Sequence, residues 1–275
     1  MIFNKNHKMG KKRILYVAQE IAPYLPESNI SLICRYLPQA IQERGKEIRT
    51  FMPRYGAINE RRNQLHEVIR LSGMNLVIDE TDHPLLIKVA SIQSARMQVY
   101  FIDNEDFFHR RAVLRDNDGI FFTDNDERAI FFARGVIETI KKLRWSPEIV
   151  HCHGWMTSVV PLILKYVLAE NPLFESTKIV VSLYDDEFYE QLNKDFSVKL
   201  LKEGIPKSAL ELIKNEANYI NLMKTVVKVS DAVIAGIENP NQELMKFAQD
   251  NNKPILGYQT EDTFVDTYIN LYESL

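Results

Sequence analysis

The chain has 275 residues, of which 45% are hydrophobic and 26% charged, a balance typical of a globular protein with a buried core. Its formal net charge of −3 gives no basis for attraction to nucleic acid or to an anionic membrane surface. Two cysteines, Cys34 and Cys152, are too few for a disulfide framework, so we expect two buried, reduced thiols.

Residues 1–12 are polar and basic and lack the following apolar stretch of a signal peptide. The apolar run Ile14–Ala18 is too short to span a bilayer. We therefore expect a flexible N-terminus over residues 1–12, and a cytoplasmic protein with no membrane segment.

Short β-branched runs alternate with longer amphipathic stretches, which is typical of βα units. Arg13–Ala18 is predicted as the first strand, Asn29–Arg44 as the helix that follows it, and Glu47–Phe51 as the second strand. Four strand-like runs then lie between residues 66 and 103. We expect the first three to form an antiparallel excursion and Met97–Asp103 to return to the main sheet.

The rest of the chain continues the alternation. Asp124–Leu143 has the wide apolar stripe of a helix, and residues 184–216 are expected to form a mobile lobe of short helices. Further strands are predicted at Glu148–Cys152, Lys178–Leu183, Ala232–Ala235 and Pro254–Leu256. The pattern predicts a Rossmann-like α/β domain over residues 13–257, with a doubly wound parallel sheet, and a C-terminal helix within 258–275 that docks on it.

The turn after the first strand, residues 19–29, contains no glycine, lysine or arginine. Its two prolines remove backbone N–H donors, and Glu20 and Glu27 add negative charge. Ser28 or Asn29 can cap the helix that follows. Because a phosphate site needs close backbone approach, free N–H groups and usually a cation, the turn predicts no tight phosphate site.

His151 and His153 come at the end of a predicted strand, where alternation puts both imidazoles on one face. Further ligands at zinc spacing are lacking, so we expect no metal and no cofactor. We interpret one histidine as packed in the core and His153, which precedes Gly154 and Trp155, as lining the rim of a cleft.

Two other clusters have competing interpretations. The run Tyr184–Glu187 holds three carboxylates, which favours a solvated helix N-terminus over the acidic metal site of some sugar-nucleotide enzymes. Phe107, Phe108, Phe121 and Phe122 could stack on sugars, but at this density we interpret most of them as core.

These segments together resemble the N-terminal domain of bacterial glycogen synthases and plant starch synthases, which are retaining glucosyltransferases of the two-domain GT-B architecture. The similarity runs from about Lys11 to Phe247. Its strongest stretch is FFHRR, followed by FFTDNDERAIFFARGVIETIKKLRWSPEIVHCHGWMTSVVPLILK, while RGKEIRTFMPRYG and NYINLMKTVVKVSDAV match in the same order. The resemblance implies the family reaction, which is transfer of glucose from ADP-glucose to the end of an α-1,4-glucan.

The family pattern also implies site residues. His153 matches the histidine of the family's H-D-W motif and is the expected catalytic residue. Asp124, Asn221 and Lys224 match positions near the family's cleft, and Tyr184 stands in the family's T-x-H-N turn. These four are the expected substrate-binding residues.

The chain departs from the family where phosphate would bind. In the family's K-x-G-G-L-x-D turn, Pro26 replaces the lysine, Ser28 and Asn29 replace the glycines, and Leu32 replaces the carboxylate. Gly154 replaces the aspartate of H-D-W. We also expect the nucleotide-binding second domain to be absent, which implies a synthase-like protein that is non-catalytic alone and binds glucan or another protein.

Two alternatives stay open. The chain could be an active glucosyltransferase in glycogen synthesis whose donor domain comes from a partner chain. It could also be a different small-molecule enzyme that uses His153, Asp185 and Asp186. The expected ligands are α-1,4-glucan or ADP-glucose, and a protein partner would use the face that the second domain covers in the family.

Overall fold

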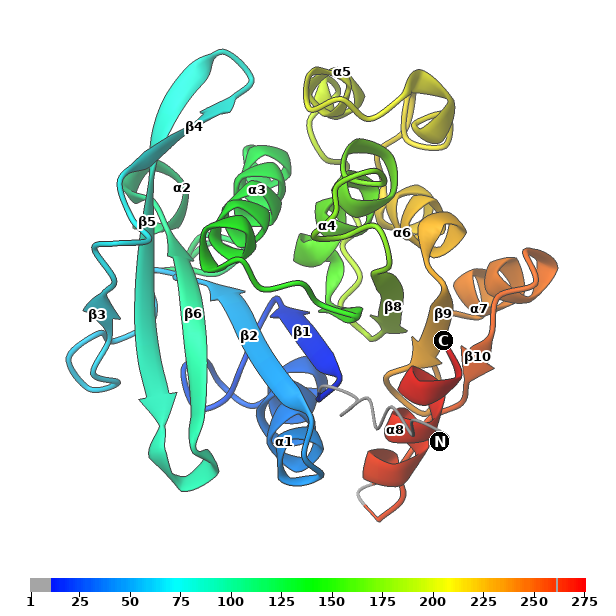
Figure 1. Ribbon diagram of the computed structural model, residues 1–275. Coiled ribbons are helices and arrows are strands. Elements are labelled where there is room, and N and C mark those ends of the chain that lie inside the picture. The colour runs from blue at the N-terminus through cyan, green and yellow to red at the C-terminus, as the bar shows by residue number, and fades with distance from the viewer. Residues whose placement is uncertain (1–10, 261) are drawn as a thin grey trace, which may run out of the picture.

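The computed structural model describes residues 11–260 and 262–275. Its centre is a mostly parallel sheet with the strand order β10-β9-β8-β7-β1-β2-β6-β5-β3, in which β4 pairs with β5 (Figure 1). The strands are β1 (Arg13–Ala18), β2 (Glu47–Pro53), β3 (His66–Glu67), β4 (Met74–Ile78), β5 (Thr81–Ile92), β6 (Met97–Asp103), β7 (Ile149–His153), β8 (Lys178–Leu183), β9 (Ala232–Ala235) and β10 (Ile255–Leu256). Because β1 pairs with β2 on one side and β7 on the other, the predicted doubly wound sheet is confirmed.

Helices cover both faces of this sheet. In Figure 1, α1 and α8 lie on one face, and α3, α4 and α6 lie on the other. The helices are α1 (Asn29–Glu43), α2 (Glu105–Phe108), α3 (Asn125–Leu143), α4 (Val159–Leu162), α5 (Phe196–Lys202), α6 (Tyr219–Val229), α7 (Gln242–Asp250) and α8 (Phe264–Ser274), with short helical turns η1 (Gln93–Ala95), η2 (Trp155–Thr157), η3 (Ile163–Val167) and η4 (Lys207–Ala209).

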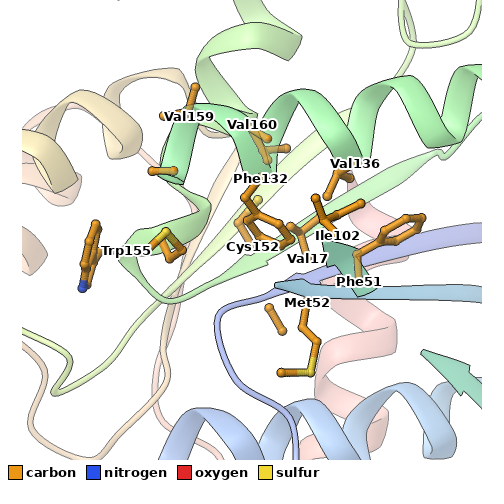
Figure 2. Close-up of a cluster of buried hydrophobic side chains, with 14 of the residues drawn as sticks. Val17, Phe51, Met52, Ile102, Phe132, Val136, Cys152, Trp155, Val159 and Val160 are labelled. Atoms are coloured by element: carbon orange, nitrogen blue, oxygen red, sulfur yellow. The ribbon is translucent and has the colours of Figure 1, made fainter. Parts of the chain in front are cut away.

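The alternation of side chains along the strands divides the core into two layers. Val17 and Cys152 face the layer under α3 and α4, together with Phe132 (Figure 2). Tyr16 and Ile149 face the layer under α1 and α8. Both cysteines are free and buried, as predicted.

Most of the predicted elements are present. Strands β3, β4 and β5 form the antiparallel excursion, and β6 returns parallel to β2. The main difference is β5: the sequence pattern predicts a strand that begins at Leu85, after a break at His83 and Pro84, but β5 begins at Thr81 and includes Pro84. There Pro84 pairs with Asn75 of β4, in a two-stranded arm beyond the main sheet, where strand edges tolerate proline.

The C-terminal helix α8 packs on the domain through the buried side chains of Tyr268 and Tyr272. Within 184–216 the structure has α5 and η4 as its helical segments, and the expected mobility stays a prediction. The expected flexible N-terminus lies outside the described residues, apart from residues 11 and 12. No helix among the described residues is both long and apolar enough to cross a membrane.

Candidate functional site

The carboxyl ends of β1, β7, β8 and β9 meet at one edge, because these strands are parallel neighbours. Ligands of open α/β sheets bind outside such strand ends. The segments that follow the strands here are the turn 19–28, η2, residues 184–188 and Gly236. Among the described residues, no group of three or more His, Cys, Asp and Glu side chains is arranged to hold a metal ion.

The N-terminus of α1 is capped by its own side chains. Ser28 is the N-cap residue, and its Oγ accepts the N–H of Ser31 at 3.0 Å, while the Oγ of Ser31 accepts the N–H of Ser28 at 2.8 Å. This is a capping box. It confirms Ser28 as the cap and takes up one of the donors that an anion would need.

Two carboxylates lie at the same helix end. The hydroxyl of Ser28 donates to Oε2 of Glu20 at 2.7 Å, and Nδ2 of Asn29 lies 3.2 Å from both carboxylate oxygens of Asp185. Two like unit charges 4 Å apart near a protein surface repel by roughly 4 kcal/mol. The dipole of a helix N-terminus offers an anion only about 0.3–1 kcal/mol. The start of α1 therefore repels a phosphate more than it attracts one.

His153 is fully buried at the end of β7. Its Nδ1 lies 2.7 Å from the hydroxyl of Tyr184, and its Nε2 has no hydrogen-bond partner among the described residues. Burial lowers the pKa of His153 to about 3 and raises the pKa of Tyr184 well above its ordinary value. In this conformation the neutral imidazole lies behind Tyr184 and not on an open rim.

His151 lies on the same face of β7, as alternation predicts, with its ring centroid 3.8 Å from that of His153. Its Nδ1 lies 2.7 Å from the hydroxyl of Tyr272 in α8, and its Nε2 lies 2.8 Å from Oγ of Ser182. Burial lowers the pKa of His151 well below its usual range. His151 is thus a packed histidine that joins the sheet to α8.

Two glycines allow side chains to fill the strand ends. A Cβ on Gly236 would lie 2.4 Å from Cε1 of Tyr184, so the tyrosine ring occupies the space that a side chain at 236 would need. A Cβ on Gly154 would lie 2.7 Å from Cβ of Gln19, and the φ of Gly154 is +86°, in the region that favours glycine. The carboxylate that the family has at this position would not fit without movement of Gln19.

Asp186 holds loops together. Its Oδ2 accepts the N–H of Trp155 at 2.7 Å, and its Oδ1 accepts the hydroxyl of Tyr219 at 3.0 Å. Burial raises the pKa of Asp186 to about 6. No helix begins at residues 184–187, so the predicted helix N-terminus there is wrong, because Asp186 instead caps the turn of another strand. Asp185 and Asp186 bond to different partners, and neither is hydrogen-bonded to His153, whose Nδ1 pairs with Tyr184.

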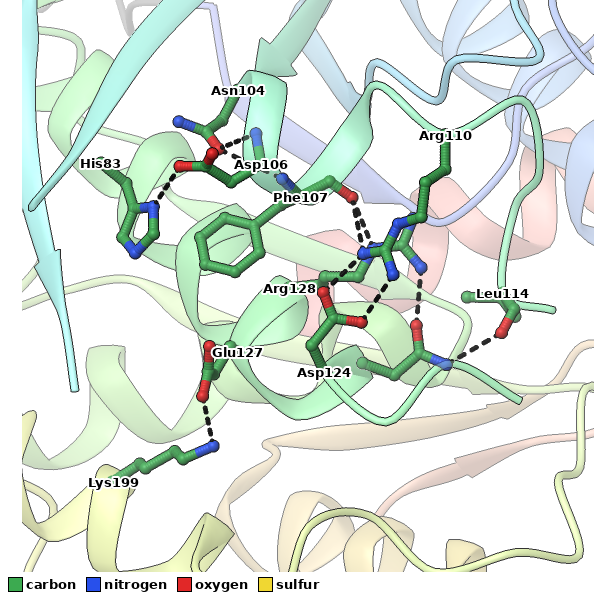
Figure 3. Close-up of polar contacts among 11 residues, drawn as sticks. His83, Asn104, Asp106, Phe107, Arg110, Leu114, Asp124, Glu127, Arg128 and Lys199 are labelled. Atoms are coloured by element: carbon green, nitrogen blue, oxygen red, sulfur yellow. Dashed lines mark hydrogen bonds and ion pairs between the residues drawn. The ribbon is translucent and has the colours of Figure 1, made fainter. Parts of the chain in front are cut away.

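Asp124 precedes α3 and forms a two-pronged ion pair with Arg110 (Figure 3). The guanidinium of Arg110 also lies over the ring of Phe122, 4.2 Å from its centroid. Phe107, Phe108 and Phe121 are buried, which agrees with their interpretation as core. A substrate would have to compete with Arg110 for the carboxylate of Asp124.

Asn221 and Lys224 lie one turn apart on α6, and both make local contacts. Nδ2 of Asn221 donates to the carbonyl of Glu216 at 2.9 Å. Lys224 pairs with Glu243 of α7, and its ammonium lies 5.7 Å from the ring centroid of Phe247. Of the predicted site residues, the structure brings His153 and Tyr184 into contact, and it gives Asp124, Asn221 and Lys224 separate partners.

Sequence reasoning missed Gln19, Gly236 and Tyr272. The amide oxygen of Gln19 accepts the N–H of Met156 at 3.1 Å and so joins the ends of β1 and β7. Gly236 directly follows β9, so its place at a strand end could have been found from the sequence. The contact between Tyr272 and His151 joins residues 121 positions apart, for which the sequence carries no local signal.

Comparisons with known proteins agree with this architecture. The protein-family model that describes the starch synthase catalytic domain matches residues 13–254 of this chain. The glycogen synthase of Chlorobium phaeobacteroides is 34% identical over 220 residues, which are 80% of this chain and 44% of that protein. The glycogen synthase of Pelodictyon phaeoclathratiforme is 36% identical over 211 residues, 76% of this chain and 42% of that protein. This chain thus spans less than half the length of these relatives.

A solved structure has the same fold. It is the catalytic domain of starch synthase IV from Arabidopsis thaliana bound to ADP and acarbose, which matches with a TM-score of 0.72 at 17% identity. The match covers 91% of this chain and 52% of that one. The fold thus defines a Rossmann-like α/β domain with the architecture of the starch synthase catalytic domain. The extent of the family match places the chain in the starch synthase catalytic-domain family, together with the bacterial glycogen synthases.

Proposed function

We propose that this chain is a non-catalytic member of the family that binds α-1,4-glucan and does not transfer glucose to it. The observation that carries the proposal is the start of α1, where Glu20 and Asp185 bond to Ser28 and Asn29. Retaining transfer from a sugar nucleotide develops charge on the departing diphosphate, and catalysis depends on groups that stabilise that charge. Carboxylates at this position repel the negative charge of the diphosphate instead of stabilising it.

The strand ends add a second argument. His153, the expected catalytic residue, has no exposed surface and bonds to Tyr184. Its pKa of about 3 leaves it neutral at pH 7, and a glucose unit could contact it only after Tyr184 had moved. Because Tyr184 packs against Gly236, that movement would disturb a closely packed region.

Glucan binding is the part of the family function that needs neither the phosphate turn nor a movable His153. The starch synthase structure with ADP and acarbose is consistent with nucleotide and saccharide ligands in the family. We extend only the saccharide to this chain, because its hydroxyl groups are neutral and the carboxylates of Glu20 and Asp185 do not repel them.

Thermal unfolding with two ligands tests the proposal. At ten times its Kd, a ligand that binds only the folded state stabilises it by about 1.4 kcal/mol, which raises Tm by roughly 3–5 °C in a domain of this size. We expect maltoheptaose at millimolar concentration to raise Tm and ADP-glucose to leave it unchanged. A rise with ADP-glucose would contradict the absence of a phosphate site, and no rise with maltoheptaose would contradict glucan binding.

A second candidate is an active glucosyltransferase assembled from two chains. The observation in its favour is an exposed apolar pair close to the strand ends, Ile120 at 62% exposure and Tyr189 at 92%. Their neighbours Phe121 and Phe188 stack on each other with centroids 5.2 Å apart, which brings the two loops together. Exposed apolar groups of this kind are typical of protein contact sites.

Its test uses the part of the Chlorobium phaeobacteroides glycogen synthase that this chain does not match. Under this alternative, the two polypeptides associate in sedimentation velocity, and their mixture incorporates glucose from ADP-glucose into glycogen. A Tyr189→Asp variant would weaken the association. Separate sedimentation with no incorporation would rule the alternative out for this partner.

A further inference from the structure

The outer face of α1 carries a groove that the strand-end site does not use. Its volume is about 710 Å³, within the range of small-molecule sites. Side chains of α1 from Asn29 to Glu43 form its floor and Ser94 closes one side. The opposite wall is formed by Tyr258, Gln259, Phe264 and Tyr268. The fifteen residues of α1 span roughly 22 Å, so the groove is elongated.

The groove begins at the strand ends. Asn29, at its start, bonds to Asp185 after β8, and Gly236 after β9 is also part of its lining. A chain-like ligand could therefore extend from the carboxyl edge of the sheet along α1. A compact ligand would fill only part of this length.

Aromatic rings are available in the groove. Tyr36 of α1 is 54% exposed and Tyr258 of the opposite wall is 47% exposed, and both belong to the lining. Tyrosine offers a flat apolar face together with a hydroxyl that donates and accepts hydrogen bonds. That combination suits a ligand with apolar ring faces and hydroxyl edges.

The polar groups of the groove balance one another in charge. Arg35 donates to the amide oxygen of Gln39 at 2.7 Å, and the amide nitrogen of Gln39 donates to Glu43 at 2.8 Å. Among the described residues that line the groove, Arg35 is the one cation and Glu43 the one anion. Because the charges of Arg35 and Glu43 cancel, and because Asp185 lies at the entrance, the described part of the groove favours a neutral ligand over a nucleotide or an acidic peptide.

We propose that the groove between α1 and the wall formed by Tyr258, Gln259, Phe264 and Tyr268 is a binding site for a linear α-1,4-glucan, which lies along α1 with sugar rings on Tyr36 and Tyr258. The inference rests on the proposed glucan binding and gives it a location away from His153. Amides such as Gln39 and Gln259 supply donors and acceptors for the sugar hydroxyls.

Calorimetric titration of the whole chain with maltoheptaose tests the location. We expect Tyr36→Ala and Tyr258→Ala each to weaken binding roughly 3- to 10-fold, as the loss of one aromatic contact does, and the double variant to weaken it further. Tyr36→Trp should keep most of the affinity. Tyr189→Ala, which removes an exposed tyrosine outside the groove, is the matched control and should bind like the wild type.

Hydrogen exchange gives a second readout that does not depend on substitutions. Maltoheptaose should slow amide exchange in α1 and in the segment that holds Tyr258 and Gln259, and should leave exchange in α6, on the other face of the sheet, unchanged. If the wild type binds maltoheptaose but the tyrosine variants bind equally well and the protection lies elsewhere, the groove is overturned and glucan binding stands. If the wild type does not bind, both the groove and the proposed glucan binding are overturned.

Discussion

At Gly236, an added Cβ would lie 2.4 Å from Cε1 and 2.7 Å from Cζ of Tyr184. The clash is with a buried ring that is itself hydrogen-bonded to His153. The clash can therefore be relieved only by movement in a packed region. We expect Gly236→Ala to lower the free energy of unfolding by about 1–3 kcal/mol, as overpacked sites do. Chemical denaturation of the variant and the wild type measures this difference in the free energy of unfolding.

Gly257→Ala is the matched control for this prediction, because nothing lies within 4 Å of a Cβ at that position. Its stability should stay within about 0.5 kcal/mol of the wild type. If both variants lose the same stability, the packing of Tyr184 against Gly236 is not the cause. A Tyr184→Ala change in the Gly236→Ala background should remove the clash but add a cavity.

The burial of His153 predicts that the free energy of unfolding depends on pH. Its folded-state pKa of about 3 lies below the value of about 6.5 in an unfolded chain, so the unfolded state binds more protons below pH 6.5. The contribution of His153 to the free energy of unfolding is therefore fully present above about pH 6.5 and is lost as the pH is lowered towards about 3. Between pH 7 and pH 5, protonation of His153 in the unfolded state should lower the free energy of unfolding by about 2 kcal/mol.

A His153→Asn variant isolates this contribution. Asp186, whose pKa is raised to about 6, changes stability in the opposite direction as the pH falls, but it is present in both proteins. We expect the difference between the two stability curves to change by about 1.4 kcal/mol per pH unit below pH 6. Parallel curves from pH 7 to pH 5 would show that His153 is accessible to protons in the folded state.

At the scale of elements, α8 depends on a few long-range contacts. The hydroxyl of Tyr272 bonds to His151 at 2.7 Å, and the Nζ of Lys12 donates to the carbonyl of Tyr272. Arg44 and Lys46 form ion pairs with α8 at the surface, where such pairs contribute little. The buried tyrosine contact should therefore dominate the docking.

Replacement of Tyr272 by phenylalanine tests the docking of α8. It leaves Nδ1 of His151 buried without its partner, which should cost about 1–3 kcal/mol. We expect faster amide exchange in α8 and a lower unfolding midpoint, whereas Tyr189→Phe at the exposed surface should change neither. Unchanged exchange in α8 would mean that apolar packing alone holds the helix.

The sequence could predict most of these elements, because their signals are local. The strand periodicity of β1, β8 and β9 and the apolar stripe of α3 gave bounds within one or two residues of those observed. The start of β5 was harder to predict, because Pro84 is unusual in a strand and is tolerated only at an edge. The length of β5 depends on its pairing with β4, which periodicity does not encode.

At the scale of the whole molecule, the family resemblance predicted the fold correctly, whereas the predicted site residues stay a prediction. Sequence alone located the altered turn at residues 26–32 and narrowed the helix cap to Ser28 or Asn29, of which the structure shows Ser28. It could not show that Tyr184 covers His153 or that Asp186 bonds to Trp155, because both contacts join residues from separate βα units. These contacts depend on how neighbouring strand ends pack together.

Incorporation of labelled glucose most directly tests whether this arrangement is non-catalytic. The purified chain is incubated with labelled ADP-glucose and glycogen at pH 7, alongside a blank without protein and a His153→Ala variant. Loss of a single charge-stabilising donor costs an enzyme about 10²–10³ in rate, and here the whole turn has changed. We predict incorporation equal to the blank for both proteins. Incorporation by the wild type that His153→Ala abolishes would contradict the account.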